Sequence, residues 1–225
     1  MKKNNVLRLS HLISSHTPSY GNRDYIKIEK KTSIVNGNTA NTSSWLFSNN
    51  HIGTHLDVPY HFNQNGKKTY EYDTNEWFFQ NVELVDMPLA NAYLINAEDL
   101  KENKISDKVE LLLFRTGFEN FRNESKYYND NPGIHPDLAG HLRINFPHLR
   151  CIGFDFISVT SWKYRQEGRE SHKNLLSPEV GLNPILAIED MSLAQLNSKI
   201  EWVIVSPLFM EDGNGGPVTV FANTL

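Results

Sequence analysis

The sequence has little cysteine, no long apolar run and no excess of charge of one sign. Cys151 is the only cysteine in 225 residues, so the chain cannot form an internal disulfide and suits a reducing compartment. No segment approaches the ~20 consecutive apolar residues that a membrane span needs. The formal net charge of -4 provides no cationic surface for nucleic acid. These absences predict a cytoplasmic protein that binds neither membranes nor nucleic acid.

Internal repeats and linker-like tracts are also missing, which predicts a single domain over residues 1–225. Short runs rich in β-branched and aromatic residues predict strands. They lie at residues 45–47, 82–87, 109–114, 151–156, 202–205 and 218–221. Short helices are expected after the N-cap Asn96 and from Pro136 onward. The pattern favours an α/β class in which strands outnumber short helices.

Histidine is concentrated in one short segment. Three of the nine histidines, His51, His55 and His61, lie within eleven residues that also contain Asp57. The spacing of the first two matches the helical zinc-protease motif, but glycine and threonine lie between them and the glutamate of that motif is absent. An extended segment would instead place His51, His55 and Asp57 on one face, where they can bind one cation. His61 is expected to serve as an acid/base group, with a ligand or structural role as the alternatives.

This segment resembles the signature of a known family. The pattern His-x-Gly-Thr-His-x-Asp-x-Pro-x-His at residues 51–61 is similar to that of the cyclase family, which contains the bacterial kynurenine formamidases. Arg-Thr-Gly at 115–117, Gly-x-Asp-x-x-Ser-Val at 153–159 and Gly-x-Pro-Val at 215–218 extend the resemblance over most of the chain. It implies a swivelling β/β/α fold, a homodimer or larger assembly, and one or two divalent metal ions. Zinc is the first expectation, and manganese, as in a related isatin hydrolase, is the second.

The resemblance also implies two metal ligands far along the chain. His172, in a His-x-x-Leu-Leu pattern, resembles the family's later histidine. Glu189 resembles the glutamate that precedes a Leu-x-Leu turn. The loop between them is longer than in the formamidases, so Glu179 and Asp190 stay open as alternatives for the distal carboxylate.

Together these residues predict a metal-dependent hydrolase with a small-molecule substrate. A divalent cation lowers the pKa of bound water from about 15.7 to about 7 and polarises a carbonyl. The resulting hydroxide would attack a small amide, cyclic amide or ester, with N-formylkynurenine as the first candidate, and His61 would protonate the leaving group. Two alternatives use the same residues: a cyclase or isomerase in which the metal acts as a Lewis acid, and a non-catalytic metal-binding protein with saturated coordination.

Overall fold

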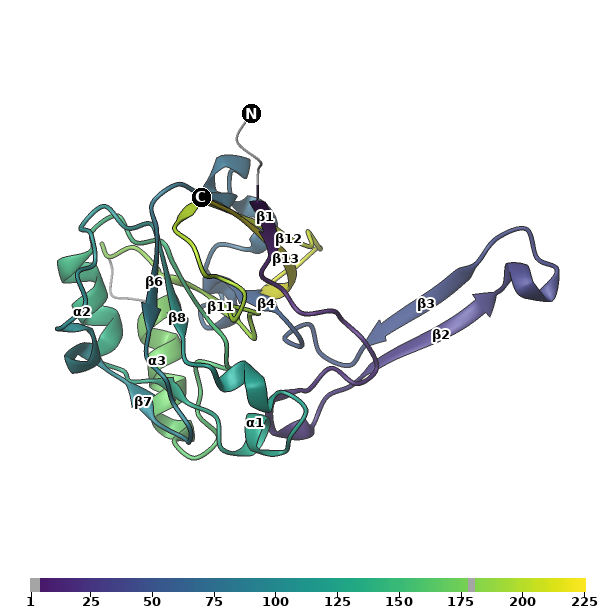
Figure 1. Ribbon diagram of the computed structural model, residues 1–225, viewed down its shortest axis with the longest axis horizontal. Coiled ribbons are helices and arrows are strands. Elements are labelled where there is room, and N and C mark those ends of the chain that lie inside the picture. Colours follow the sequence, from purple (N-terminus) through teal and green to yellow (C-terminus); the bar gives the residue numbers. More distant parts are fainter. Residues whose placement is uncertain (1–4, 178–180) are drawn as a thin grey trace.

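The computed structural model describes residues 5–177 and 181–225, and nine of the strands in this part join in one sheet. In order along the sheet they are β5 (Phe78–Phe79), β12 (Ile200–Pro207), β13 (Gly215–Thr224), β4 (His55–Asp57), β11 (Leu186–Glu189), β10 (Cys151–Phe154), β8 (Leu111–Arg115) and β6 (Val82–Asp86), while β1 (Asn5–Arg8) pairs with β13. Figure 1 shows the sheet with helices packed beside it. The strand-rich α/β fold expected from the sequence is confirmed.

The sheet has a parallel and an antiparallel part, which meet at β4. Strands β6, β8, β10 and β11 run parallel to one another. The three-residue β4 pairs antiparallel with β11 on one side and with β13 on the other. The residues of β4, β10 and β11 are all buried. The junction therefore lies inside the molecule, where polar side chains need partners.

The helices are short. The helix expected from Pro136 is confirmed as α2 (Leu138–Asn145), and α1 spans Lys126–Asn129. After Asn96, whose side chain accepts the Glu98 N–H as predicted, the chain makes only a 3-10 turn. Such turns lie at Tyr20–Asn22, Ile34–Asn36, Pro59–His61, Thr69–Glu71, Thr74–Trp77, Ala97–Leu100 and Phe118–Phe121. No helix in the described residues is long and apolar enough to cross a membrane.

The longest described helix, α3 (Arg165–Leu176), has no counterpart among the predicted elements. Its buried face has helical spacing but consists of Gly168, Ser171 and His172 before the two leucines at its end. Because three of these five positions are small or polar, the face carries no apolar stripe. Hydrophobic periodicity therefore does not reveal this helix.

A two-stranded arm projects from the rest of the molecule (Figure 1). It consists of β2 (Ile26–Thr32) and β3 (Thr42–Phe47), and the predicted strand at 45–47 is the end of β3. Ile28 lies opposite Trp45 in the ladder, and Trp45 and Leu46 are 55% and 53% exposed. Two short strands, β7 (Leu94–Ile95) and β9 (Gly133–Ile134), pair separately.

Candidate metal centre

Strands β4 and β11 bring three of the candidate ligands together. His55 and Asp57 are two residues apart on β4, so their side chains leave the same face of the sheet. Glu189, the last residue of β11, lies opposite His55 in the ladder. The Nε2 atom of His55 is 3.2 Å from a Glu189 carboxylate oxygen and 3.6 Å from an Asp57 oxygen. All three residues are buried.

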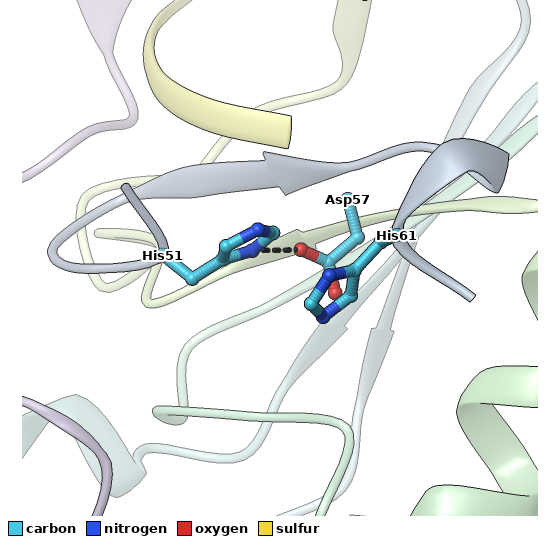
Figure 2. Close-up of side chains that lie close together, drawn as sticks. All are labelled: His51, Asp57 and His61. Carbon is cyan, nitrogen blue, oxygen red and sulfur yellow. Dashed lines mark hydrogen bonds and ion pairs between the residues drawn. The ribbon is translucent and has the colours of Figure 1, made fainter. Parts of the chain in front are cut away.

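His51 approaches the same carboxylate from a turn. The expectation that the extended segment begins at His51 is wrong, because Gly53 has a φ of 72° and β4 starts only at His55. A backbone with this left-handed φ cannot continue a strand. The turn nevertheless brings His51 Nδ1 to 2.7 Å from Asp57 Oδ1, as Figure 2 shows. His51 and Asp57 thus lie close together as predicted, but a turn rather than an extended segment brings them together.

The segment before β13 packs against His51. The Nε2 atom of His51 lies 3.1 Å from the side-chain oxygen of Asn214. A Cβ atom on the next residue, Gly215, would lie 2.7 Å from His51 Cε1 and would also collide with the carbonyl of Leu56. Glycine is therefore required here for the imidazole to fit beside the strand. Sequence reasoning found the Gly-x-Pro-Val pattern but not the contribution of Asn214.

His172 enters from α3. Its Nε2 atom lies 3.3 Å from Asp57 Oδ2 and 3.4 Å from Glu189 Oε1. Its Nδ1 atom lies 3.0 Å from the carbonyl oxygen of Gly168, and Nδ1 of His55 lies 2.9 Å from that of Gly53. A carbonyl can only accept, so Nδ1 carries the proton in both rings and Nε2 faces the carboxylates. Histidines that bind metals are commonly oriented in this way.

His61 lies at the edge of the same cluster, at the end of the 3-10 turn Pro59–His61. Its ring stacks on that of His51 with centroids 4.0 Å apart (Figure 2). Burial lowers the pKa of His61 to about 4, so the ring is neutral near pH 7. A neutral imidazole in this place can accept a proton or bind a cation.

The ligand-type atoms form two groups that share Asp57. One contains His51, Asp57 and His61, and the other contains His55, Asp57 and Glu189. Within each group the ligand atoms lie within 4.8 Å of one another. Imidazole nitrogens and carboxylate oxygens are donors that zinc and manganese accept. The residues present therefore fit one or two divalent cations.

The pKa values of the residues in the cluster also favour a bound cation. Burial lowers the pKa of His55 and His172, but the adjoining Glu189 and Asp57 carboxylates outweigh it and raise these pKa values to about 9 and about 10. Burial raises the pKa of Glu189, while the two histidines bring it down to about 2. The buried carboxylates thus recruit positive charge, which a proton or a metal ion can supply. Because a cation must displace these protons, metal affinity should fall as the pH falls.

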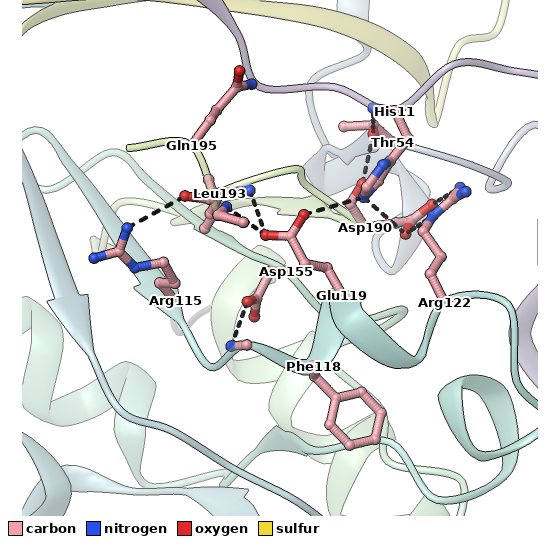
Figure 3. A network of polar contacts seen from close by, with 12 residues as sticks. His11, Thr54, Arg115, Phe118, Glu119, Arg122, Asp155, Asp190, Leu193 and Gln195 are labelled. Atoms are coloured by element: carbon pink, nitrogen blue, oxygen red, sulfur yellow. Dashed lines mark hydrogen bonds and ion pairs between the residues drawn. The ribbon is translucent and has the colours of Figure 1, made fainter. Parts of the chain in front are cut away.

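Among the three alternatives for the distal carboxylate, the described structure brings Glu189 to the cluster. Glu179 lies outside the described residues. Asp190, with a φ of 55°, accepts hydrogen bonds from Arg122 at 2.9 and 2.7 Å and from the Tyr127 hydroxyl at 2.5 Å. Figure 3 shows this separate polar network. Adjacent residues of the chain thus serve two different buried clusters.

The network around Asp190 also positions the candidate ligands. Thr54 donates its hydroxyl to the Asp190 carbonyl at 2.5 Å and accepts the His11 N–H at 2.9 Å (Figure 3). These bonds tie the turn before His55 to the residue after Glu189. The Val159 N–H donates to Glu189 at 2.7 Å. Sequence reasoning missed Thr54 and Val159 as supporting groups, because contacts between distant segments leave no local pattern.

A pocket of about 440 Å³ opens at the cluster. Its lining includes all six sequence-predicted site residues, namely His51, His55, Asp57, His61, His172 and Glu189. Phe62 also lines it and stacks on His172 with ring centroids 4.9 Å apart. The cluster is therefore accessible to a small molecule.

The Cyclase family model matches residues 7–161. The chain belongs to the cyclase family. A relative from Bacillus cereus, named kynurenine formamidase, is 30% identical over 168 residues, covering 75% of this chain and 73% of that protein. The predicted membership is thus confirmed, and the matched range includes the 51–61 segment. It ends before His172 and Glu189, whose placement in this member of the cyclase family comes from the structure.

Solved structures show the same fold as this cyclase family member. Isatin hydrolase A from Labrenzia aggregata superposes with a TM-score of 0.81 at 19% identity, covering 98% of this chain and 94% of that chain. A potential metal-dependent hydrolase with cyclase activity gives a TM-score of 0.76 at 21% identity, covering 99% of both chains. At these identities the likeness concerns the fold.

Proposed function

We propose that the chain is a metal-dependent hydrolase of small amides, cyclic amides or cyclic esters. The observation that carries this proposal is the convergence of three imidazoles and two buried carboxylates at the base of an open pocket. Two of the imidazoles, His55 and His172, are oriented by backbone carbonyls. The names of the relatives, a kynurenine formamidase and an isatin hydrolase, support the same reaction class.

Five residues would hold one or two ions, with zinc as the first choice and manganese as the second. They are His51, His55, Asp57, His172 and Glu189. A divalent cation bound there supplies a Lewis acid and lowers the pKa of water. Asp57 belongs to both groups of ligand-type atoms, so it would be a ligand whichever group holds the ion.

The protein's own groups have two tasks in this proposal. The Val159 N–H and the Ser158 hydroxyl hold one oxygen of Glu189, at 2.7 and 3.4 Å. A ring nitrogen of His61 accepts a proton from the attacking water and later gives it to the leaving amine or alcohol. His61 suits this task because it lines the pocket beside the cluster and stacks on His51.

The first candidate substrate is an aryl formamide such as N-formylkynurenine. Its formyl carbon is unhindered and can approach the candidate ligands that line the pocket. We expect the chain, reconstituted with zinc or manganese, to hydrolyse at least one of N-formylkynurenine, isatin and a small lactone with kcat/KM above about 10⁴ M⁻¹s⁻¹. Turnover should disappear with a chelator and return with metal.

Product analysis completes this test, because hydrolysis adds one water to the substrate whereas isomerisation leaves its mass unchanged. A value below about 10² M⁻¹s⁻¹ for the formamide would remove it as the natural substrate. If the purified chain contains no transition metal and gains none on reconstitution, the proposed function is wrong.

We also propose that the chain forms a homodimer through the arm of β2 and β3. An isolated two-stranded ribbon is marginally stable in water, and this one exposes Ile28, Trp45 and Leu46. A second copy of the chain would cover these side chains, and two-fold dimers are the commonest assemblies of soluble proteins. Sedimentation should show a dimer that Trp45→Ser with Leu46→Ser converts to a monomer. A wild-type chain that is monomeric at about 100 µM would refute the dimer.

A further inference from the structure

Three guanidinium groups line the pocket beside the candidate metal centre. They belong to Arg23, Arg165 and Arg169. Within residues 5–177 and 181–225, none of the three has a carboxylate oxygen within 4.0 Å, whereas Arg115, Arg122 and Arg150 do. Guanidinium groups that no protein carboxylate neutralises, at a pocket wall, can donate hydrogen bonds to an anion.

An aromatic side chain supports two of these groups. The guanidinium carbons of Arg23 and Arg165 lie 5.5 and 5.0 Å from the ring centroid of Trp162. Tyr20, which also lines the pocket, meets the same ring edge-on at 5.1 Å. Stacking restrains a guanidinium group, so less conformational entropy is lost when its N–H groups bind a ligand.

Helix α3 relates the arginines to the metal centre. Arg165, Arg169 and His172 are spaced by four and three residues, so they share one face of the helix. With a rise of about 1.5 Å per residue, Arg169 precedes His172 by about 4.5 Å along the axis and Arg165 by about 10 Å. Arg169 and then Arg165 therefore lie at increasing distance from the candidate metal ligand His172, on the same wall of the pocket.

The charge of this wall favours an anion. The carboxylates of Asp57 and Glu189 are matched by the imidazoles around them. Asp24 is the other carboxylate in the lining, and it accepts hydrogen bonds from Ser48 and Asn49 at 3.1 and 3.3 Å. Beside the imidazole cluster, the pocket lining thus carries three guanidinium groups and one carboxylate, Asp24. That carboxylate already accepts hydrogen bonds from neutral donors.

We propose that Arg165 and Arg169, with Arg23 beside them, bind a carboxylate group of the substrate. The reacting carbonyl would lie at the candidate metal centre, and the carboxylate would lie about one to two helical turns away along α3. This inference rests on the proposed hydrolase function and adds the class of substrate: an amide or cyclic ester that carries a carboxylate. It makes the two arginines specificity-determining residues.

Binding of a matched pair of unreactive ligands tests the proposal. The pair is 4-oxo-4-phenylbutanoate and its uncharged analogue 1-phenylpentane-1,4-dione, in which a methyl ketone replaces the carboxylate, titrated calorimetrically into zinc-loaded protein. The wild-type chain should bind the carboxylate at least about tenfold more tightly than the dione, as charge-assisted hydrogen bonds imply. The double variant Arg165→Gln, Arg169→Gln should lose this preference and keep its affinity for the dione.

Lys173→Gln is the matched control, because it removes a positive charge from α3 at an exposed position outside the pocket lining. It should leave the preference intact. The proposal is overturned if neither ligand binds, if the wild-type chain has no preference, or if the preference survives in the double variant. The last result would place the carboxylate on the metal. Since neither ligand has a scissile bond, a failure here is distinct from a failure to hydrolyse the substrate panel.

Discussion

Replacing Asp57 with asparagine should weaken metal binding by more than about 100-fold. This loss is larger than the one expected for a residue that only supports the metal ligands, for which about 100-fold is the upper limit. The Asp57 carboxylate contacts three imidazoles, with oxygen-to-nitrogen distances of 2.7 Å to His51, 3.6 Å to His55 and 3.3 Å to His172. Asparagine keeps the shape but removes the charge. Competition with a chromophoric chelator at fixed pH measures the change in affinity.

Asp190→Asn is the matched control, because Asp190 is also a buried aspartate and follows a candidate ligand directly. It should lower the free energy of unfolding, since its carboxylate pairs with Arg122 at 2.7 Å, and leave metal affinity nearly unchanged. Its backbone carbonyl, which accepts from Thr54, remains in place. If Asp190→Asn loosens the metal as much as Asp57→Asn does, the assignment of the two clusters is wrong.

Replacing His61 with alanine should lower kcat by roughly 10²- to 10⁴-fold while the protein keeps its metal, because acid/base groups contribute about this much. His61 is less buried than His55 and His172. Steady-state turnover on the best panel substrate and metal content by elemental analysis are both needed.

His61→Gln separates proton transfer from ligation. Glutamine offers an oxygen to a cation but cannot exchange a proton near neutral pH. Under the proposed role, the alanine and glutamine variants should be equally slow and equally loaded with metal. Loss of metal in His61→Ala to the extent seen in His55→Ala, with recovery in His61→Gln, would make His61 a ligand.

The part of the site that the sequence predicts is the part encoded by neighbouring residues. The 51–61 segment places four ligand-type side chains within two turns and one short strand, so composition and spacing reveal them. The pairing of Glu189 with His55 depends on the ladder between β4 and β11. Strand β11 was not among the elements predicted from pattern. Only the family resemblance indicated Glu189.

His172 presents the same difficulty for a different reason. A helix that brings a ligand to a buried site must bury polar and small residues, here His172, Ser171 and Gly168. This removes the apolar periodicity by which helices are found. The elements that carry distant ligands are thus the hardest to predict from pattern, whereas the strands of the apolar core, such as β8 and β10, are readily predicted.

The position of β4 in the sheet has a consequence for how the chain folds. Both strands that flank residues 55–57 come from much later in the chain, at 186–189 and 215–224. Closing such long loops costs entropy before any pairing is gained, so these contacts should form late. During synthesis the histidine-rich segment therefore emerges long before its neighbours exist. The centre is assembled last, and a chain truncated before β13 would carry every candidate ligand without the strand that holds Asp57 in place.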